Sequence, residues 1–200
     1  MRKKFIITMI ILFAVTTPLA AFIASIDAPD PGHPPEMLPS DQYIRHTTTR
    51  IINAPQLMTK QWLENRRLTS FMTATEGLPS VVSTTPIAGI WGENGATRYA
   101  NLDNGHTAID RIIENRDPDL FHYQVFGFTA ASRYIVDHIE GRIEYTALTP
   151  DQTRISWSYG IAPTSILTRP IASTFMENRI VPFMENTMNQ MARAAEAELN

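Results

Sequence analysis

The sequence predicts an α+β fold in which a curved antiparallel sheet wraps around a long C-terminal helix, preceded by an N-terminal membrane segment. Three features indicate this: an uncharged N-terminal stretch, a central series of short alternating segments separated by turn residues, and a long amphipathic stripe at the C-terminal end. The chain has 200 residues, 44% of them apolar and 18% charged. This composition is sufficient for one ordinary domain with a real core.

The amphipathic stripe lies within residues 168–200. At helical spacing its apolar side chains share one face, and most of the charged and amide residues share the other. Pro182 is on the polar side, where it is expected to bend the helix rather than end it. The stripe predicts a long helix packed against a core. Its apolar members are Met176, Ile180, Phe183, Met184, Met188, Met191 and Ala195.

At the other end, Arg2, Lys3 and Lys4 precede an uncharged stretch over residues 5–26. Its length matches the ~20 apolar residues that span a bilayer. A secretory signal with its core at residues 5–15 is the alternative, but the following residues fit a cleavage site poorly. We interpret residues 1–26 as a retained anchor. The positive-inside rule then predicts a membrane-anchored domain on the extracytoplasmic (periplasmic) side, or a secreted one if the segment is cleaved.

Residues 27–42 contain five prolines and predict an extended linker. At ~3.1 Å per residue such a linker holds a domain up to ~50 Å from the membrane. The folded domain is expected over residues 43–200.

Within that domain, residues 43–52 alternate and predict a strand, followed by a short helix over residues 56–63 and a second helical piece over residues 65–72. A meander of strands comes next, and Asp103-Asn104-Gly105 is a strong hairpin signal within it. A sheet of this kind must cover its apolar face, and the C-terminal helix is the large amphipathic cover. The hollow between them is a natural apolar ligand site. The meander strands are expected over residues 81–90, 96–102, 106–115, 120–129, 133–148 and 152–161.

Composition excludes several kinds of chemistry. The chain has no cysteine, which rules out disulfides and thiolate chemistry. Without the three N-terminal basic residues, 14 basic residues face 20 acidic ones, so no nucleic-acid partner is expected. The five histidines show no metal-ligand spacing, and neither a serine elbow nor a phosphate-binding loop is present. We therefore expect no metal site and no cofactor.

The best candidates for polar chemistry are Arg98 and Asp110, on strands joined by the predicted hairpin. If both point inward they must pair, because a lone buried charge is costly. Such a pair, with Tyr123 or alternatively Tyr145 as a further participant, could orient a polar group of a ligand or act in acid–base work. A purely structural ion pair is the alternative.

Large aromatic side chains and methionines suggest a roomy interior. Each of them taken singly is explained equally well as core filling. As a set, they are the predicted ligand-binding residues: Trp62, Tyr123, Tyr145, Trp157, Tyr159, Phe175, Met176, Phe183, Met184 and Met188.

The layout and several local motifs resemble the START/polyketide-cyclase (SRPBCC) superfamily, in particular its polyketide cyclase/dehydrase and lipid transport branch. The resemblance covers residues 43–199 and depends on the order and spacing of motifs that are weak singly. The motifs are Asn53-Ala54-Pro55-Gln56 before a helix with Trp62, Gly95-Ala96-Thr97-Arg98 before the hairpin, Asp117-Pro118 leading into Phe121-His122-Tyr123-Gln124-Val125, Thr153-Arg154-Ile155-Ser156-Trp157, and Arg169-Pro170.

The resemblance implies a helix-grip fold with a pocket for lipids, sterols, polyketides or other apolar molecules. It does not imply one reaction, because one fold hosts many functions. We expect binding or transport of an apolar small molecule rather than catalysis. A cyclase/dehydratase-type enzyme and a non-enzymatic protein-interaction module are the alternatives.

Overall fold

The structure is a computed structural model that describes residues 33–75 and 78–199. Within these ranges no helix is long and apolar enough to cross a membrane. The predicted anchor over residues 1–26 and the first part of the linker lie outside the described residues. The membrane segment therefore stays a prediction.

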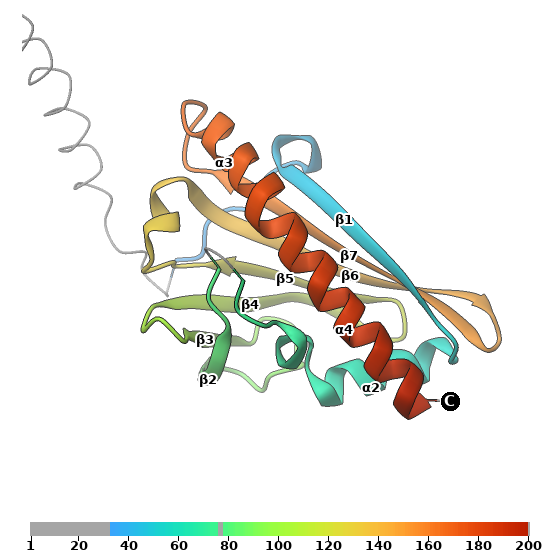
Figure 1. Cartoon of the computed structure of the whole chain (residues 1–200). Helices are drawn as coiled ribbons and strands as arrows, with labels where there is room; N and C mark the ends of the chain where they lie inside the picture. Colours follow the sequence, from blue (N-terminus) through green and yellow to red (C-terminus); the bar gives the residue numbers. More distant parts are fainter. Residues whose placement is uncertain (1–32, 76–77, 200) are drawn as a thin grey trace, which may run out of the picture.

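A seven-stranded antiparallel sheet is the main layer of the fold, in the order β1-β7-β6-β5-β4-β3-β2 (Figure 1). Strands β2 to β7 follow one another as a meander, and β1 joins at the β7 edge. This matches the predicted strand order. The strands are β1 (Ile44–Ile52), β2 (Val81–Ala88), β3 (Thr97–Leu102), β4 (Thr107–Arg116), β5 (Leu120–Phe126), β6 (Val136–Thr149) and β7 (Gln152–Pro163).

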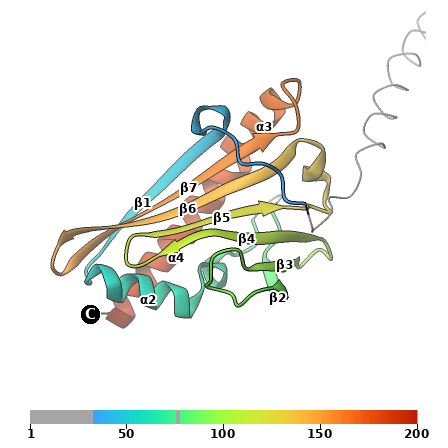
Figure 2. The ribbon, with the colours of Figure 1, turned by 180° about the vertical axis from the view of Figure 1, so that it is seen from behind.

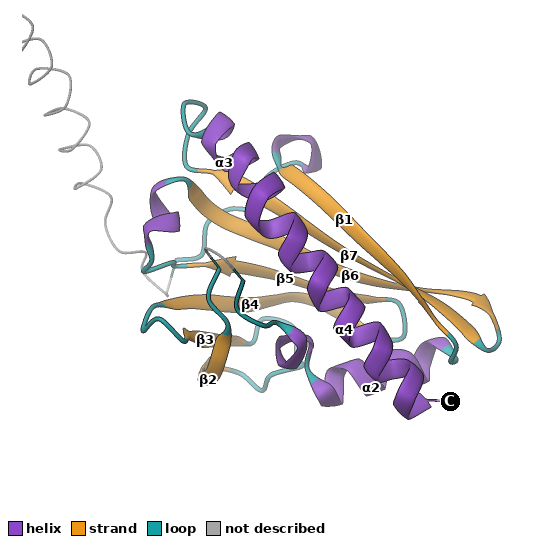
Figure 3. Ribbon diagram, viewed as in Figure 1, coloured by secondary structure: helices purple, strands orange, loops and turns teal. Residues whose placement is uncertain are grey.

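The C-terminal helix is a rod of three consecutive parts across the concave face of the sheet (Figure 3). These are α3 (Arg169–Phe175), a π-helical segment η4 (Met176–Ile180) and α4 (Val181–Leu199). Pro182 is the second residue of α4, and one residue separates it from the π-helical segment. A proline lacks the N–H that an α-helical turn needs, and the wider π turn accommodates that loss without ending the rod.

Shorter helices connect the remaining elements. They are η1 (Ser40–Gln42), α2 (Gln56–Arg66), η2 (Leu68–Phe71) and η3 (Ala131–Tyr134). The helix predicted over residues 56–63 therefore continues for three more residues. Its one fully buried charge, Lys60, donates a hydrogen bond to Asn115 at 2.8 Å and pairs with Asp117, which fixes α2 against the β4–β5 turn.

The largest differences between predicted and observed strand boundaries lie between β5 and β6. Strand β5 ends at Phe126 rather than residue 129, and β6 begins at Val136 rather than residue 133. Gly127 adopts a positive φ of 66°, and η3 follows it. Such a conformation is open to glycine but turns the chain out of the sheet. Local alternation alone did not reveal this turn.

The apolar stripe of the helical rod packs on the β1–β7 side of the sheet. Met184, Met188, Met191 and Trp157 are completely buried there. Glu185 on α4 secures the same contact, because it accepts hydrogen bonds from Thr48 and Arg50 of β1, both at 2.7 Å. The prediction that this stripe faces the core is confirmed.

The end of the proline-rich linker lies on the outer, convex face of the sheet (Figure 2). Gln124 of β5 donates a hydrogen bond to the carbonyl of Pro35 at 2.9 Å, and the Leu38 amide donates to the Tyr43 hydroxyl at 3.0 Å. That hydroxyl also lies 2.8 Å from Nε2 of the buried His138. Residues 35–42 are thus docked, unlike the free spacer expected over residues 27–42. Prolines prevent a helix but leave their carbonyls free to accept hydrogen bonds.

Candidate functional site

A cavity of about 860 Å³ lies between the concave face of the sheet and the helical layer. Strands β3 to β6 form its floor, and η2 and the helical rod form its roof. Its walls are mostly apolar, and its volume falls within the range of small-molecule sites. Apolar wall residues include Leu68, Met72, Val81, Trp91, Ala100, Phe121, Val125, Phe128, Ile139 and Ile143.

The hollow exists because α4 covers only one side of the sheet. The rod runs beside β1 and crosses β7 and β6, while β3 and β2 lie beyond it (Figure 1). Small side chains enlarge the space at that side, because Ala100 of β3 and Ala108 of β4 are cross-strand partners and both line the cavity. Larger residues at this pair would fill the floor.

A glycine in β6 makes room for the ring of Tyr123 at the cavity wall. Gly141 is the register partner of Tyr123 on β5 and of Tyr159 on β7. A Cβ at Gly141 would lie 2.2 Å from Cζ of Tyr123, so the ring occupies the space that a side chain would need. The Trp157 indole donates a hydrogen bond to the Tyr123 hydroxyl at 3.1 Å and fixes the orientation of the ring.

An ion pair forms the polar part of the wall. Arg98 and Asp110 are direct cross-strand partners on β3 and β4, and Nε of Arg98 donates to Oδ2 of Asp110 at 2.9 Å. Their side chains are only 9% and 11% exposed. The Trp91 ring covers the guanidinium at 3.4 Å from its centroid. A carboxyl group and an arginine therefore reach a cavity whose walls are mostly apolar.

Burial sets the protonation of the groups around this pair. Desolvation raises the pKa of Asp110, although the Arg98 guanidinium opposes that rise. Desolvation also raises the pKa of Tyr123, Tyr159 and Tyr145. The three phenols are therefore neutral at physiological pH. They can donate hydrogen bonds to an oxygen of a ligand, and Arg98 can do the same.

The structure brings together part of the predicted site. Arg98 and Asp110 line the cavity, as do five of the ten predicted ligand-binding residues: Tyr123, Tyr145, Tyr159, Phe175 and Phe183. The other five, Trp62, Trp157, Met176, Met184 and Met188, do not contribute to its walls.

Each residue outside the walls has another packing role. Trp157, Met176, Met184 and Met188 belong to the core between the rod and the β1–β7 side of the sheet. Trp62 stacks on Phe71 of η2, with ring centroids 5.9 Å apart, and donates a hydrogen bond to Glu198 at 2.9 Å.

Several wall residues were not among the predicted ones. Trp91 is the first residue of a glycine-containing turn and lies outside any periodic pattern, yet it covers Arg98 and makes an edge contact with Phe121. Ile139 and Ile143 lie four residues apart, and therefore on one face, in the strand predicted over residues 133–148, but their position at the cavity depends on the neighbouring strands. Leu68 and Met72 lie in irregular structure, where periodicity gives no guidance.

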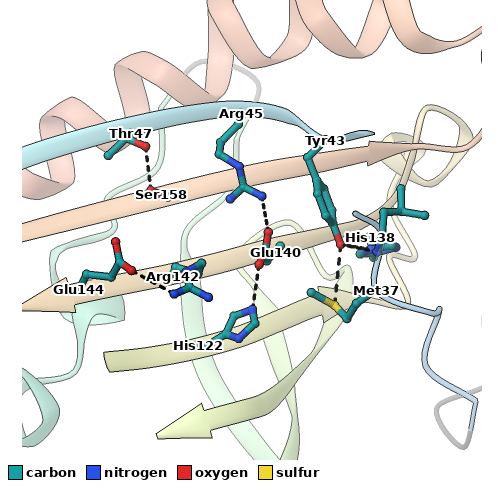
Figure 4. Close-up of polar contacts among 11 residues, drawn as sticks. Met37, Tyr43, Arg45, Thr47, His122, His138, Glu140, Arg142, Glu144 and Ser158 are labelled. Atoms are coloured by element: carbon teal, nitrogen blue, oxygen red, sulfur yellow. Dashed lines mark hydrogen bonds and ion pairs between the residues drawn. The ribbon is translucent and has the colours of Figure 1, made fainter. Parts of the chain in front are cut away.

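The histidines lie away from the cavity centre. His122 and His138 are on the convex face, where His122 contacts Glu140 at 2.9 Å and Nε2 of His138 contacts the Tyr43 hydroxyl at 2.8 Å (Figure 4). Nδ1 of His138 contacts Asp137 at 2.8 Å. His106 is exposed at the cavity rim. Across the part of the chain that the structure describes, no three acidic or histidine side chains gather in a way that could hold a metal ion.

Comparison with known proteins gives matches at the level of structure alone. No family model and no curated protein matches the chain. Among solved structures, the Zhui aromatase/cyclase of a Streptomyces species superposes with a TM-score of 0.59 at 15% identity, over 78% of this chain and 95% of that one.

Two plant proteins superpose similarly. The major latex-like protein 151 of Panax ginseng has a TM-score of 0.56 at 10% identity, over 76% of this chain and 96% of that one. A norcoclaurine synthase mutant of Thalictrum, in complex with a transition-state analogue, has a TM-score of 0.54 at 12% identity, over 76% and 92%.

The sheet, the helical rod across its concave face and the cavity between them define a helix-grip protein. The chain has the fold of the START/polyketide-cyclase (SRPBCC) superfamily, which confirms the resemblance seen in its motifs. At these identities the likeness concerns the fold, because one fold carries many functions.

Proposed function

We propose that the protein binds or carries an apolar small molecule of the lipid or polyketide kind in the cavity, while residues 1–26 tether it outside the cytoplasmic membrane. The observation that carries the proposal is the cavity of about 860 Å³ with mostly apolar walls. An apolar molecule of matching size would gain many dispersion contacts with such walls. A solved neighbour with a bound transition-state analogue supports a small-molecule role for this fold.

The polar wall indicates what kind of apolar molecule fits. Arg98, Asp110 and the neutral hydroxyls of Tyr123 and Tyr159 reach a cavity whose remaining walls are largely apolar. A buried polar group gains from a partner that satisfies its hydrogen bonds. The matching ligand has an extended apolar body and one oxygen-containing group, such as a carbonyl, hydroxyl or carboxyl.

Native mass spectrometry tests the binding proposal. The chain without residues 1–26 is purified without detergent, and its bound species are extracted into organic solvent. We expect an additional mass that matches one apolar compound or a narrow class. A clean ligand-free mass, together with no change in tryptophan fluorescence across a panel of lipids, would contradict the proposal.

A cyclase/dehydratase-type reaction in the same cavity is the second candidate. It is favoured by one observation: a carboxyl with a raised pKa lies beside an arginine at the cavity wall, in reach of neutral tyrosine hydroxyls. Asp110→Asn should then abolish turnover of a candidate polyketide-like substrate while the protein still folds and binds it. Glu114→Gln on the same strand is the control, and full turnover by Asp110→Asn would rule out this assignment.

A protein-interaction module whose interior is filled by its own side chains was the third alternative. The cavity is not filled in this way. The structure therefore favours the two small-molecule functions.

A further inference from the structure

One end of the molecule gathers three connections that are distant in sequence. Thr164 directly follows β7 and joins this connection to η3. Its amide donates a hydrogen bond to the Ile135 carbonyl at 3.2 Å, and its hydroxyl donates one to the Tyr134 carbonyl at 3.0 Å. Arg169, at the start of α3, donates to the Gln42 carbonyl at 2.9 Å. Residues 33–42, 127–135 and 164–171 are called the α3 end below (Figure 1).

The α3 end carries a cluster of exposed aliphatic side chains. Ile166 is 78% exposed, Leu167 is 85% exposed and Ile171 is 58% exposed. Ile166 and Leu167 are the two most exposed large apolar side chains among the described residues. Three such residues within six positions expose more apolar surface than single scattered side chains do, and grouped exposure of this kind is typical of a contact site.

The chain reaches this end from a short tether. Because residues 35–42 are docked on the sheet, only residues 27–34 separate them from the last residue of the uncharged segment, Ile26. Eight extended residues span about 26 Å at ~3.3 Å each. Figures 1 and 2 both show the first described residues next to the end of β5 and η3. If residues 5–26 span a bilayer, the α3 end is the part of the domain held beside it.

We propose that the α3 end docks on the lipid surface, with Ile166, Leu167 and Ile171 inserted at the boundary between headgroups and acyl chains. The proposal depends on the membrane tether of the proposed function. It also gives the cavity an orientation, because Phe128, Ala131 and Ile135 line the cavity at this end and Ala131 is exposed. An apolar ligand could then pass between bilayer and cavity over a short path.

The exposed aliphatic side chains alone would not keep the domain on the membrane, and the charged residues of the α3 end would not add enough attraction without the tether. A small inserted apolar surface gives only weak and reversible membrane binding, and stable attachment takes a second signal. The tether supplies it by keeping the cluster at a high effective concentration near the bilayer. Charges of both signs occur at this end, so the contact should be insensitive to salt and should form on zwitterionic lipid. The Lys, Arg, Asp and Glu residues of the α3 end are Arg133, Arg169, Glu36 and Asp41.

The absence of cysteine from the sequence allows a site-specific test. The full chain carrying Leu167→Cys is labelled with an environment-sensitive fluorophore and reconstituted into phosphatidylcholine vesicles that contain a lipid-borne quencher. Leu148→Cys is the matched control, because Leu148 is also exposed but lies at the β6–β7 hairpin, at the opposite end of β7. We expect quenching several-fold stronger at position 167 than at position 148, unchanged between low and high salt.

Three other outcomes would overturn the docking proposal. Equal quenching at both positions would show that the α3 end makes no preferred lipid contact. A blue-shifted label at position 167 without lipid quenching would assign the cluster to a protein contact, either with a second copy or with the chain's own N-terminal segment. A chain that does not float with vesicles would overturn the anchor together with the docking.

Ligand binding in the cavity is measured separately by the extraction experiment, so its failure is distinguishable from failure of docking. A second variant guards against an effect of the label. In a chain labelled at Ile171→Cys, the added changes Ile166→Ser and Leu167→Ser should remove most of the lipid quenching and leave the melting temperature unchanged, since both side chains are exposed in the folded domain. Undiminished quenching in that variant would contradict the proposed role of the two side chains.

Discussion

Gly141 shows how one missing side chain shapes the cavity wall. Tyr123 lies across it from β5, and Tyr159 is its partner on β7. A methyl group at this position would lie 2.2 Å from the ring of Tyr123, and that ring cannot move far inside a packed core. A glycine is therefore needed here because the Tyr123 ring leaves no space for a side chain. The backbone does not require it, because the φ angle of Gly141 is not positive.

Gly141→Ala should destabilise the protein by about 1–3 kcal/mol, the usual cost of overpacking. In a Tyr123→Leu background the same change should cost much less, because the ring atoms that would clash are absent. Chemical denaturation of the four proteins in this double-mutant cycle measures the coupling. Equal costs in both backgrounds would show that Tyr123 is not the group that excludes a side chain here.

At the scale of elements, the convex face of β6 carries a polar row that joins three strands (Figure 4). Glu140 receives hydrogen bonds from Arg45 of β1 and from His122 of β5, the second at 2.9 Å. Burial by itself would raise the pKa of Glu140. The bonds from His122 and Arg45 outweigh burial and lower the pKa from 4.5 to about 2.

This lowered pKa predicts a specific acid response. A carboxyl whose pKa is lower in the folded state stabilises the fold above its unfolded pKa and loses that contribution as pH falls through the folded value. The wild-type free energy of unfolding should therefore decrease between about pH 4.5 and about pH 2. Glu140→Gln should be less stable at neutral pH and show a shallower decrease over that range, as measured by urea unfolding at several pH values.

Glu144→Gln is the matched control, because Glu144 lies on the same face of β6 but is about half exposed and contacts only its neighbour Arg142 among the described ion pairs. It should retain the wild-type pH dependence. Parallel curves for wild type and Glu140→Gln would remove Glu140 as the source of the acid response.

The docked linker is a second feature at this scale. The Tyr43 hydroxyl accepts a hydrogen bond from the Leu38 amide and contacts His138, so one side chain ties the linker to β6. Tyr43→Phe should cost about 1 kcal/mol of stability, the net value of a typical buried hydrogen bond. Hydrogen exchange of the Leu38 amide should accelerate strongly. Tyr99→Phe on β3 is the control, and unchanged protection of Leu38 in Tyr43→Phe would contradict the role given to the hydroxyl.

For the whole molecule, the position of the cavity between sheet and rod couples ligand binding to stability. A ligand that binds only the folded state at 100 times its dissociation constant adds about 2.7 kcal/mol. Ala100→Phe places a ring in the cavity floor and should abolish this ligand-dependent rise in melting temperature. Ala147→Phe, on an exposed part of β6, should leave the rise intact. A ligand response that survives Ala100→Phe would place the binding site elsewhere.

Much of the fold was predictable from local patterns. Alternation of two residues identified the strands, helical spacing identified the C-terminal rod, and Asp103-Asn104-Gly105 identified the β3–β4 hairpin. These patterns depend on interactions between near neighbours in the chain, which every fold of this sequence must respect. The uncharged N-terminal segment belongs to the same class of signal, although its structure lies outside the described residues.

The cavity was predictable as a class of feature but not residue by residue. Helical spacing places Met184, Met188 and Phe183 on one face, yet only Phe183 lines the cavity. The direction in which the rod crosses the sheet decides which part of its apolar face packs on strands and which part lines the cavity. This direction results from packing among elements that are distant in sequence. For the same reason Trp157 packs in the core, whereas Tyr159, two residues further along β7, lines the cavity.

The sequence therefore determines the elements, their order and the faces that they bury, because periodicity and turn chemistry act over a few residues. Only the tertiary structure decides that the proline-rich linker docks on the convex face, that Gly141 makes room for Tyr123, and that Trp91 covers the Arg98–Asp110 pair. Each of these contacts joins residues from different elements. Its geometry depends on strand register and on the path of the helical rod, which no short stretch of sequence specifies.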